Sequence, residues 1–165
     1  MTKIRTEETR EDDKKVDLKK VTKDLTAKRQ TSGRYSNLTP KGLNRDELLL
    51  GVVGYLGVPY SYGEQSREGM DCSAFTAQVY ADAVRRTLPR STRDQFQIGS
   101  EVTPDDLQFG DLVFFNTTGY SPSHVGIYIE DDLFVHASVT YGVTISSLES
   151  TYYRKRFIGA RRVFD

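Results

Sequence analysis

The chain has 165 residues, enough for one domain with its own core and too few for two domains of typical size. Its 23 basic side chains balance 23 acidic ones, and this formal net charge of +0 gives no global field that would attract nucleic acid or an anionic membrane surface. No stretch approaches the roughly 18 apolar residues of a membrane-spanning helix. Residues 1–30 also lack the apolar core of a signal peptide, so a leader or lipid anchor would belong to a longer precursor.

The first part of the chain is dominated by mixed charge and holds almost no aromatic residues. Such a segment buries too little apolar surface to offset the entropy of ordering it. Residues 1–36 are therefore predicted to be a charged flexible tail or linker, and residues 37–165 the folded domain. Leu18, Val21 and Leu25 follow a helical stripe, so a short helix that docks on a partner is the alternative.

The folded part is predicted to begin with a buried helix. Asn44, followed three residues later by Glu47, resembles a capping box at a helix start. The apolar run over residues 48–56 is too long for a half-exposed strand and indicates a helix with little contact to water. Gly57 and Pro59 should end it.

Two more helices are expected before the strands. One opens at Cys72 and carries apolar residues on a single face, which should lie on the sheet. The other is short, begins at the cap-like Ser91 and ends at Gly99.

Strand-like segments fill the second half of the chain. Their short spacing permits only hairpins, so helices packed on a five-stranded antiparallel sheet in meander order are predicted, an α+β domain. The expected strands are Asp111–Asn116, His124–Glu130, Leu133–Ser138, Val143–Ser147 and Phe157–Phe164.

The alternation of side chains along strands relates the two histidines of the chain. His124 and Gly126 share one face of their strand, and His136 lies on the next strand. If the intervening turn pairs residue 129 with residue 133, both imidazoles lie diagonally on one face, whereas a shift of one residue separates them. Gly126, which lacks a side chain, is expected to leave room for the cysteine-bearing helix.

Cys72 is the only cysteine, and its position at the start of a helix suits a reactive thiol. Helix N–H groups should lower its pKa to about 7 or below. His124 and His136 then supply the general base and the polar group that orients it in a Cys-His hydrolase. The alternatives are a buried structural cysteine and a metal site of two histidines and one cysteine, but no fourth metal ligand follows at short spacing. We expect no metal and no organic cofactor.

Several ordered motifs make the chain resemble the NlpC/P60 family of bacterial cell-wall cysteine peptidases, over about residues 44–165. Any one of these motifs is weak, but their common order and compatible spacing are specific. The C-terminal part looks most like the Spr (MepS) murein endopeptidase branch. The motifs are VPYSYG from Val58, DCSAF from Asp71, LPRST from Leu88, GDLVFF from Gly110, HVGIYI from His124, FVHA from Phe134 and ARR from Ala160.

The resemblance implies a compact papain-like domain of the NlpC type and assigns roles by motif. Cys72 corresponds to the nucleophile, His124 to the base and His136 to the residue that orients the base. Tyr60 matches the tyrosine whose hydroxyl forms an oxyanion hole with the backbone N–H of Cys72.

Further positions of the motifs match residues that contact the bound peptide. Asp71 and Ser73 are among them, with Asp71 near the free amine of the peptide. The chain departs from the usual family pattern at Ala74, where a methyl group narrows the space near the nucleophile. It departs again at Glu64, which adds a carboxylate at the expected rim of the binding cleft.

The implied function is that of a peptidoglycan hydrolase, a cysteine endopeptidase of the D,L type that cleaves amide bonds in murein stem peptides or cross-links. The implied partner is the peptidoglycan stem peptide. The implied location is outside the cytoplasm, in the periplasm or cell envelope, and we expect the protein to be a monomer. Two alternatives use the same cleft: a cell-wall-binding module without catalysis, and an amidase or acyltransferase.

Overall fold

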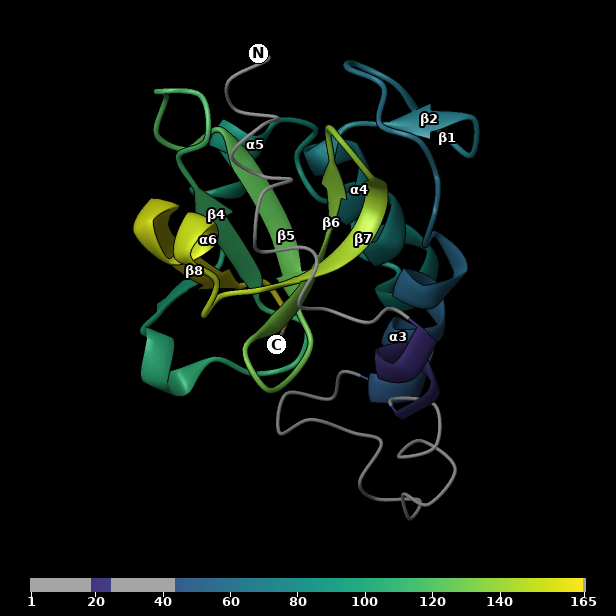
Figure 1. The fold of residues 1–165 in the computed structure, drawn as a ribbon, viewed down its shortest axis with the longest axis horizontal. Coiled ribbons are helices and arrows are strands. Elements are labelled where there is room, and N and C mark those ends of the chain that lie inside the picture. Colours follow the sequence, from purple (N-terminus) through teal and green to yellow (C-terminus); the bar gives the residue numbers. More distant parts are fainter. Residues whose placement is uncertain (1–18, 25–43, 165) are drawn as a thin grey trace.

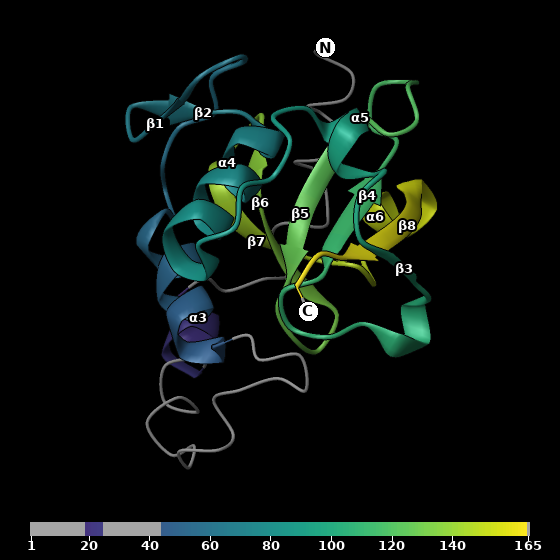
Figure 2. The ribbon, with the colours of Figure 1, turned by 180° about the vertical axis from the view of Figure 1, so that it is seen from behind.

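The computed structural model describes residues 19–24 and 44–164, which form helices on both faces of one central sheet (Figures 1 and 2). No helix in these two ranges is both long and apolar enough to cross a membrane. The helices are α3 (Arg45–Gly54), α4 (Cys72–Val79), α5 (Thr92–Gln95) and α6 (Thr151–Arg156), with a π turn, η3 (Tyr80–Val84), and a 3-10 turn, η4 (Pro104–Asp106). The strands of the sheet are β3 (Ser100–Val102), β4 (Leu112–Phe115), β5 (His124–Tyr128), β6 (Leu133–Ser138), β7 (Gly142–Ser147) and β8 (Phe157–Arg162), and β1 (Gln65–Ser66) and β2 (Gly69–Met70) form a separate hairpin.

The predicted first helix is confirmed as α3. The side chain of Asn44 caps it by accepting a hydrogen bond from the backbone N–H of Glu47 at 3.0 Å. A short helix over residues 19–24 places Val21 against the same hydrophobic cluster that α3 helps to build. The predicted boundary between tail and domain, at residues 36 and 37, lies outside the described residues.

The short helix after Ser91 forms, but it ends earlier than predicted. Ser91 accepts a hydrogen bond from the backbone N–H of Asp94 at 3.1 Å and caps α5, which stops at Gln95. Gly99 does adopt a positive φ of 71°, a conformation that favours glycine, but it lies in the following turn.

The prediction of a five-stranded meander is partly wrong. Four strands do follow one another as hairpins, but the sheet has six strands in the order β3-β8-β4-β5-β6-β7. The last strand returns across the sheet after α6 and pairs with β4. A bidentate ion pair helps to hold β8 beside β4. Arg162 donates from Nε and Nη2 to the two carboxylate oxygens of the buried Asp111 at 2.9 and 2.8 Å.

The predicted register between the histidine strands is confirmed. Ile127 pairs with Val135, and the backbone N–H of Ile129 donates to the carbonyl of Leu133 at 2.9 Å. The prediction for Gly126 is wrong, because it lies on the face of the sheet away from α4. A Cβ atom there would lie 2.8 Å from the ring of Phe134 and 3.1 Å from Cβ of His136, so the missing side chain makes room for these two residues.

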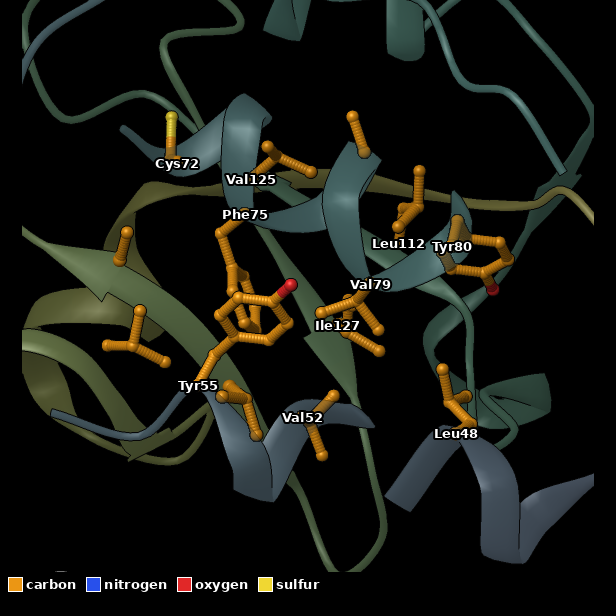
Figure 3. Packing of buried hydrophobic residues seen from close by; sticks show 14 of the residues in the cluster. Leu48, Val52, Tyr55, Cys72, Phe75, Val79, Tyr80, Leu112, Val125 and Ile127 are labelled. Carbon is orange, nitrogen blue, oxygen red and sulfur yellow. The ribbon is translucent and has the colours of Figure 1, made fainter. Parts of the chain in front are cut away.

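The sheet separates two hydrophobic clusters, and the larger one holds the cysteine-bearing helix. Phe75 and Val79 of α4 pack on Val125 and Ile127 of β5, which point to the same side (Figure 3). Full burial of a side chain such as Phe75 stabilises the fold by about 1.5–3 kcal/mol. Cys72 lies at the open end of α4, at the edge of this cluster (Figure 3). Packing along α4 therefore sets the position of the thiol relative to β5.

Candidate active site

Cys72 opens α4, as the sequence predicted. Asp71 is the N-cap residue, and its side chain accepts a hydrogen bond from the backbone N–H of Ala74 at 2.9 Å. Cys72 is buried, with 7% of the residue exposed, and its sulfur forms a hydrogen bond with the hydroxyl of Thr92 at 3.4 Å. The backbone N–H of Val125 also donates to the sulfur, which places the thiol beside the first residues of β5.

The prediction of a low thiol pKa is wrong for the substrate-free protein. Burial raises the pKa of Cys72 above its ordinary value, and the hydrogen bonds from Thr92 and Val125 offset this only in part. The nearby charge of Asp71 acts in the same direction as burial. The resting group at neutral pH is therefore the thiol, and a base is needed to form the thiolate.

The two imidazoles meet as the strand register requires. Nε2 of His124 lies 2.8 Å from Nδ1 of His136, with the ring planes nearly perpendicular. Nε2 of His136 lies 2.8 Å from the hydroxyl of the buried Ser146 on β7. The site thus contains a chain of three polar side chains from three adjacent strands, and Ser146 was not predicted as part of it.

Both imidazoles are shielded from water. The rings of Phe134 and Tyr153 lie 4.7 and 5.3 Å from that of His136, which is 0% exposed. Burial lowers the pKa of His124 to about 4, and burial together with the neighbouring His124 lowers the pKa of His136 well below its ordinary value. Both rings are neutral at pH 7.

No hydrogen bond joins the sulfur of Cys72 to His124 within the described ranges, and the sulfur instead forms hydrogen bonds with Thr92 and Val125. Val125 directly follows His124 in β5, so the sulfur interacts with the neighbour of the proposed base. In substrate-free enzymes the bond between nucleophile and base is often long, and it tightens when substrate binds.

Tyr60, which the family resemblance predicts to be an oxyanion donor, is held in place by its backbone. It pairs with Met70 in a parallel bridge, in which Met70 donates to the carbonyl of Pro59 at 3.0 Å and Ser61 donates to that of Met70 at 3.2 Å. This bridge holds Tyr60 beside the residues just before Cys72. Burial, followed by the charges of Cys72 and Asp71, raises the pKa of Tyr60 to about 12. Its hydroxyl therefore remains protonated and able to donate throughout the neutral range.

The predicted peptide-contact residues lie around Cys72 in a connected network. Asp71 and Ser73 both bind the guanidinium of Arg90. Burial acts to raise the pKa of Asp71, but hydrogen bonds from Arg90, Ala74 and Gly63 outweigh it and hold that pKa below its usual range. Glu64 is exposed, and its carboxylate accepts a hydrogen bond from the hydroxyl of Ser61 at 2.8 Å.

A buried amide fixes the segment that carries Arg90 and Thr92. Gln95 is 0% exposed, and its amide nitrogen donates to the carbonyls of Ser73 and Pro89 at 3.1 and 2.8 Å. Its oxygen accepts a hydrogen bond from Thr76 at 2.7 Å. These bonds join α5 to the first turns of α4. The motif LPRST was visible in the sequence, but its spacing alone gave no role to Arg90 or Thr92.

A thiol at the start of a helix and two hydrogen-bonded imidazoles on an antiparallel sheet are the groups that a Cys-His hydrolase uses, and here the sulfur interacts with the strand residue that follows His124. Comparison with known proteins gives the family. The sequence profile of the NlpC/P60 family matches residues 57–162. The chain therefore belongs to the NlpC/P60 family, as its motifs predicted.

Two curated relatives from Escherichia coli K12 show how far the similarity extends. Probable endopeptidase NlpC is 45% identical over 108 residues, which are 65% of this chain and 70% of that protein. Murein DD-endopeptidase MepS/Murein LD-carboxypeptidase is 43% identical over 109 residues, which are 66% of this chain and 57% of that protein.

A solved structure confirms the predicted α+β class. The crystal structure of an NlpC/P60 family protein from Bacillus cereus ATCC 10987 superposes with a TM-score of 0.67 at 34% sequence identity. The match covers 73% of this chain and 40% of that one.

Proposed function

We propose that this chain is a peptidoglycan hydrolase, a cysteine endopeptidase that cleaves amide bonds in murein stem peptides or in the cross-links between them. The relative named as a murein endopeptidase and carboxypeptidase supports the substrate class. The observation that carries the chemistry is the hydrogen bond of 2.8 Å between His124 and His136, next to the strand residue that touches the thiol. We propose Cys72, His124, His136 and Tyr60 as its catalytic set.

The first step of the proposed mechanism starts from two neutral groups. Nε2 of His124 is occupied by His136, so Nδ1 is the nitrogen that takes the proton of the Cys72 thiol as the sulfur attacks the amide carbon. The C–S bond forms as the carbonyl π bond opens. The hydroxyl of Tyr60 and the backbone N–H of Cys72 donate hydrogen bonds to the resulting oxyanion.

The second half of the cycle reverses these proton transfers. The imidazolium of His124 gives its proton to the leaving amine as the C–N bond breaks, which leaves a thioester on Cys72. His124 then removes a proton from water, whose oxygen attacks the thioester and releases the carboxylic acid. The thiolate regains the proton from His124, and the resting pair is restored.

His136 is proposed to fix the tautomer of His124. For Nδ1 of His124 to accept a proton, its Nε2 must donate to Nδ1 of His136. The remaining N–H of His136 then donates to the hydroxyl of Ser146 at 2.8 Å. The same relay faces the positive charge that forms on His124 during the reaction, which favours the imidazolium.

The proposed place of action is the cell envelope outside the cytoplasm, because the substrate lies there. We propose that the chain acts as a monomer, since every group of the proposed catalytic set comes from one chain. Size-exclusion chromatography with light scattering tests this, and a stable dimer contradicts it.

Digestion of purified muropeptides with mass-spectrometric identification of the products tests the function. The chain should release peptide fragments, and Cys72→Ala should abolish their release while its thermal unfolding stays close to that of the parent. Binding of muropeptides without cleavage by the parent chain indicates a wall-binding module instead. Transfer of an acyl group without cleavage within the peptide indicates an acyltransferase.

A further inference from the structure

Arg90 forms hydrogen bonds with both residues that flank Cys72 in the sequence, Asp71 and Ser73. Its Nη1 donates to Oδ1 of Asp71 at 3.0 Å and to the hydroxyl of Ser73 at 2.9 Å, and its Nη2 donates to Oδ2 of Asp71 at 3.1 Å. The loop that carries it is held against α4 by the buried Gln95. The guanidinium therefore has a fixed position beside Cys72.

The carboxylate of Asp71 has no acceptor capacity left for a substrate. Besides the two bonds from Arg90, it accepts one from the backbone N–H of Ala74 and one from that of Gly63, each at 2.9 Å. A carboxylate offers about four lone-pair sites, and four strong donors fill them. The side chain of Asp71 is only 11% exposed. Asp71 is consequently a positioning residue that caps α4 and holds Arg90.

Arg90 keeps free donors where Asp71 has no free acceptors. A guanidinium has five N–H groups, and the three bonds to Asp71 and Ser73 use three of them. The other two, on Nε and Nη2, lie parallel along one edge of the group, and no acceptor in the described ranges takes them. The side chain is 43% exposed, so a ligand is able to approach the group from solvent. Two parallel N–H groups match the two oxygens of a carboxylate.

We propose that Arg90 binds a carboxylate of the stem peptide through its Nε and Nη2 edge and selects substrates in which that carboxylate is free over those in which it is an amide. This inference rests on the proposed function for its substrate. An amide presents one acceptor oxygen and a competing N–H₂ donor, so it loses one of the two bonds and places a donor against a donor. The charge of Arg90 is largely offset by Asp71, so the fork geometry matters more than the net charge.

Binding to an inactive chain tests the subsite without requiring turnover. Isothermal titration of Cys72→Ala should use a purified disaccharide tetrapeptide and its derivatives, each with one carboxylate converted to the amide. We expect one derivative to bind about 10–100-fold more weakly than the parent muropeptide, the loss typical of a charge-assisted bidentate contact. In Cys72→Ala/Arg90→Gln this preference should disappear.

Two further variants separate recognition from the structural role of Arg90. Cys72→Ala/Arg90→Lys keeps the charge beside Asp71 but lacks the fork, so it should keep the fold and lose most of the preference. Cys72→Ala/Arg154→Gln removes the same charge from an exposed position on α6, across the sheet from α4, and should keep the full preference. Thermal melts of all variants report the state of the fold.

Equal binding of the free and amidated muropeptides overturns the proposal. So does an equal loss of affinity for both muropeptides in the Arg90→Gln variant, because that result would show that Arg90 acts only by positioning Asp71. Absence of binding to any muropeptide also overturns it. A binding preference without cleavage by the parent chain supports the subsite and contradicts only the proposed catalysis.

Discussion

Nε2 of His124 lies 2.8 Å from Nδ1 of His136, and this contact joins two strands that share a single tight turn. Neither nitrogen has access to bulk water, because His136 is fully buried and His124 nearly so. A hydrogen bond between two neutral, buried imidazoles requires opposite roles of the two nitrogens. The contact therefore allows only two tautomer pairs. The pair in which Nε2 of His124 donates leaves Nδ1 of His124 free to accept a proton, and this pair is the physical basis of the role that we propose for His136.

Substitution of His136 tests that role. His136→Asn should retain more activity on muropeptides than His136→Ala, because an amide oxygen is able to accept the hydrogen bond of His124 and a methyl group is not. Loss of a buried hydrogen-bond partner costs about 1–3 kcal/mol, so both variants should also melt at lower temperature. Values of kcat and melting temperature for both variants decide the matter. Losses of activity that simply follow losses of stability would make His136 a packing residue.

The low histidine pKa values predict an acid-sensitive fold. The pKa of His124 falls from 6.5 in the unfolded chain to about 4 in the folded one, and that of His136 shifts in the same direction. Above pH 6.5 both states are neutral and stability is unaffected. Between pH 6.5 and 4 the unfolded chain binds protons that the folded chain excludes, so stability falls as the pH is lowered, by on the order of 3 kcal/mol for His124.

Thermal melts between pH 7.5 and 4.5 measure this effect. These two residues are the only histidines of the chain, and most carboxylates titrate below this window. The double variant His124→Gln/His136→Gln should therefore show a flatter dependence of melting temperature on pH. A parent chain whose melting temperature is constant between pH 6.5 and 4.5 would contradict the assignment.

The position of the histidines was predictable because it depends on local rules. Alternation along β5 and β6 and a short turn between them are enough to bring His124 and His136 to one face. The start of α3 was equally local, since the side chain of Asn44 acts on a backbone group three residues away. Features of this kind are set within a few residues of sequence.

Features that depend on distant contacts were missed. The pairing of β8 with β4 joins segments far apart in the sequence and is accompanied by the ion pair between Arg162 and Asp111, which are 51 residues apart. The raised pKa of Cys72 has a similar origin, because helix geometry favours a thiolate whereas burial against β5 disfavours it, and only the folded chain shows how much water remains. The network around Arg90 likewise joins Asp71 to a residue 19 positions later.

The pKa of the thiol predicts slow alkylation. At pH 7 Cys72 should react with iodoacetamide more slowly than free cysteine, because only the thiolate is nucleophilic and burial raises the pKa of the thiol. The rate should continue to rise with pH beyond the range in which free cysteine levels off. Mass spectrometry of timed samples gives the rate, and fast labelling at pH 7 would show that the resting group is the thiolate.

Tyr60 gives a test of transition-state stabilisation. Tyr60→Phe removes one donor to the oxyanion and should lower kcat by about 10²–10³-fold with little change in KM. The hydroxyl is a protonated donor because its pKa is raised to about 12, so the effect should be constant between pH 6 and 9. Steady-state kinetics on a purified muropeptide measure both constants. A rise in KM at unchanged kcat would show that Tyr60 binds substrate instead.

Thr92 is expected to tune the nucleophile through the hydrogen bond of 3.4 Å between its hydroxyl and the sulfur of Cys72. When the thiolate forms, this hydroxyl donates to it and favours the charged form, which lowers the pKa of Cys72 against the effect of burial. Thr92→Val keeps the branched shape without the hydroxyl, so it should raise the thiol pKa further and lower kcat/KM by about tenfold. Thr92→Ser keeps the hydroxyl and should remain close to the parent chain. The pH profile of iodoacetamide labelling distinguishes hydrogen bonding by Thr92 from packing alone. If Thr92 only packs, the profile of Thr92→Val should not shift, and Thr92→Ser should be the more damaging change.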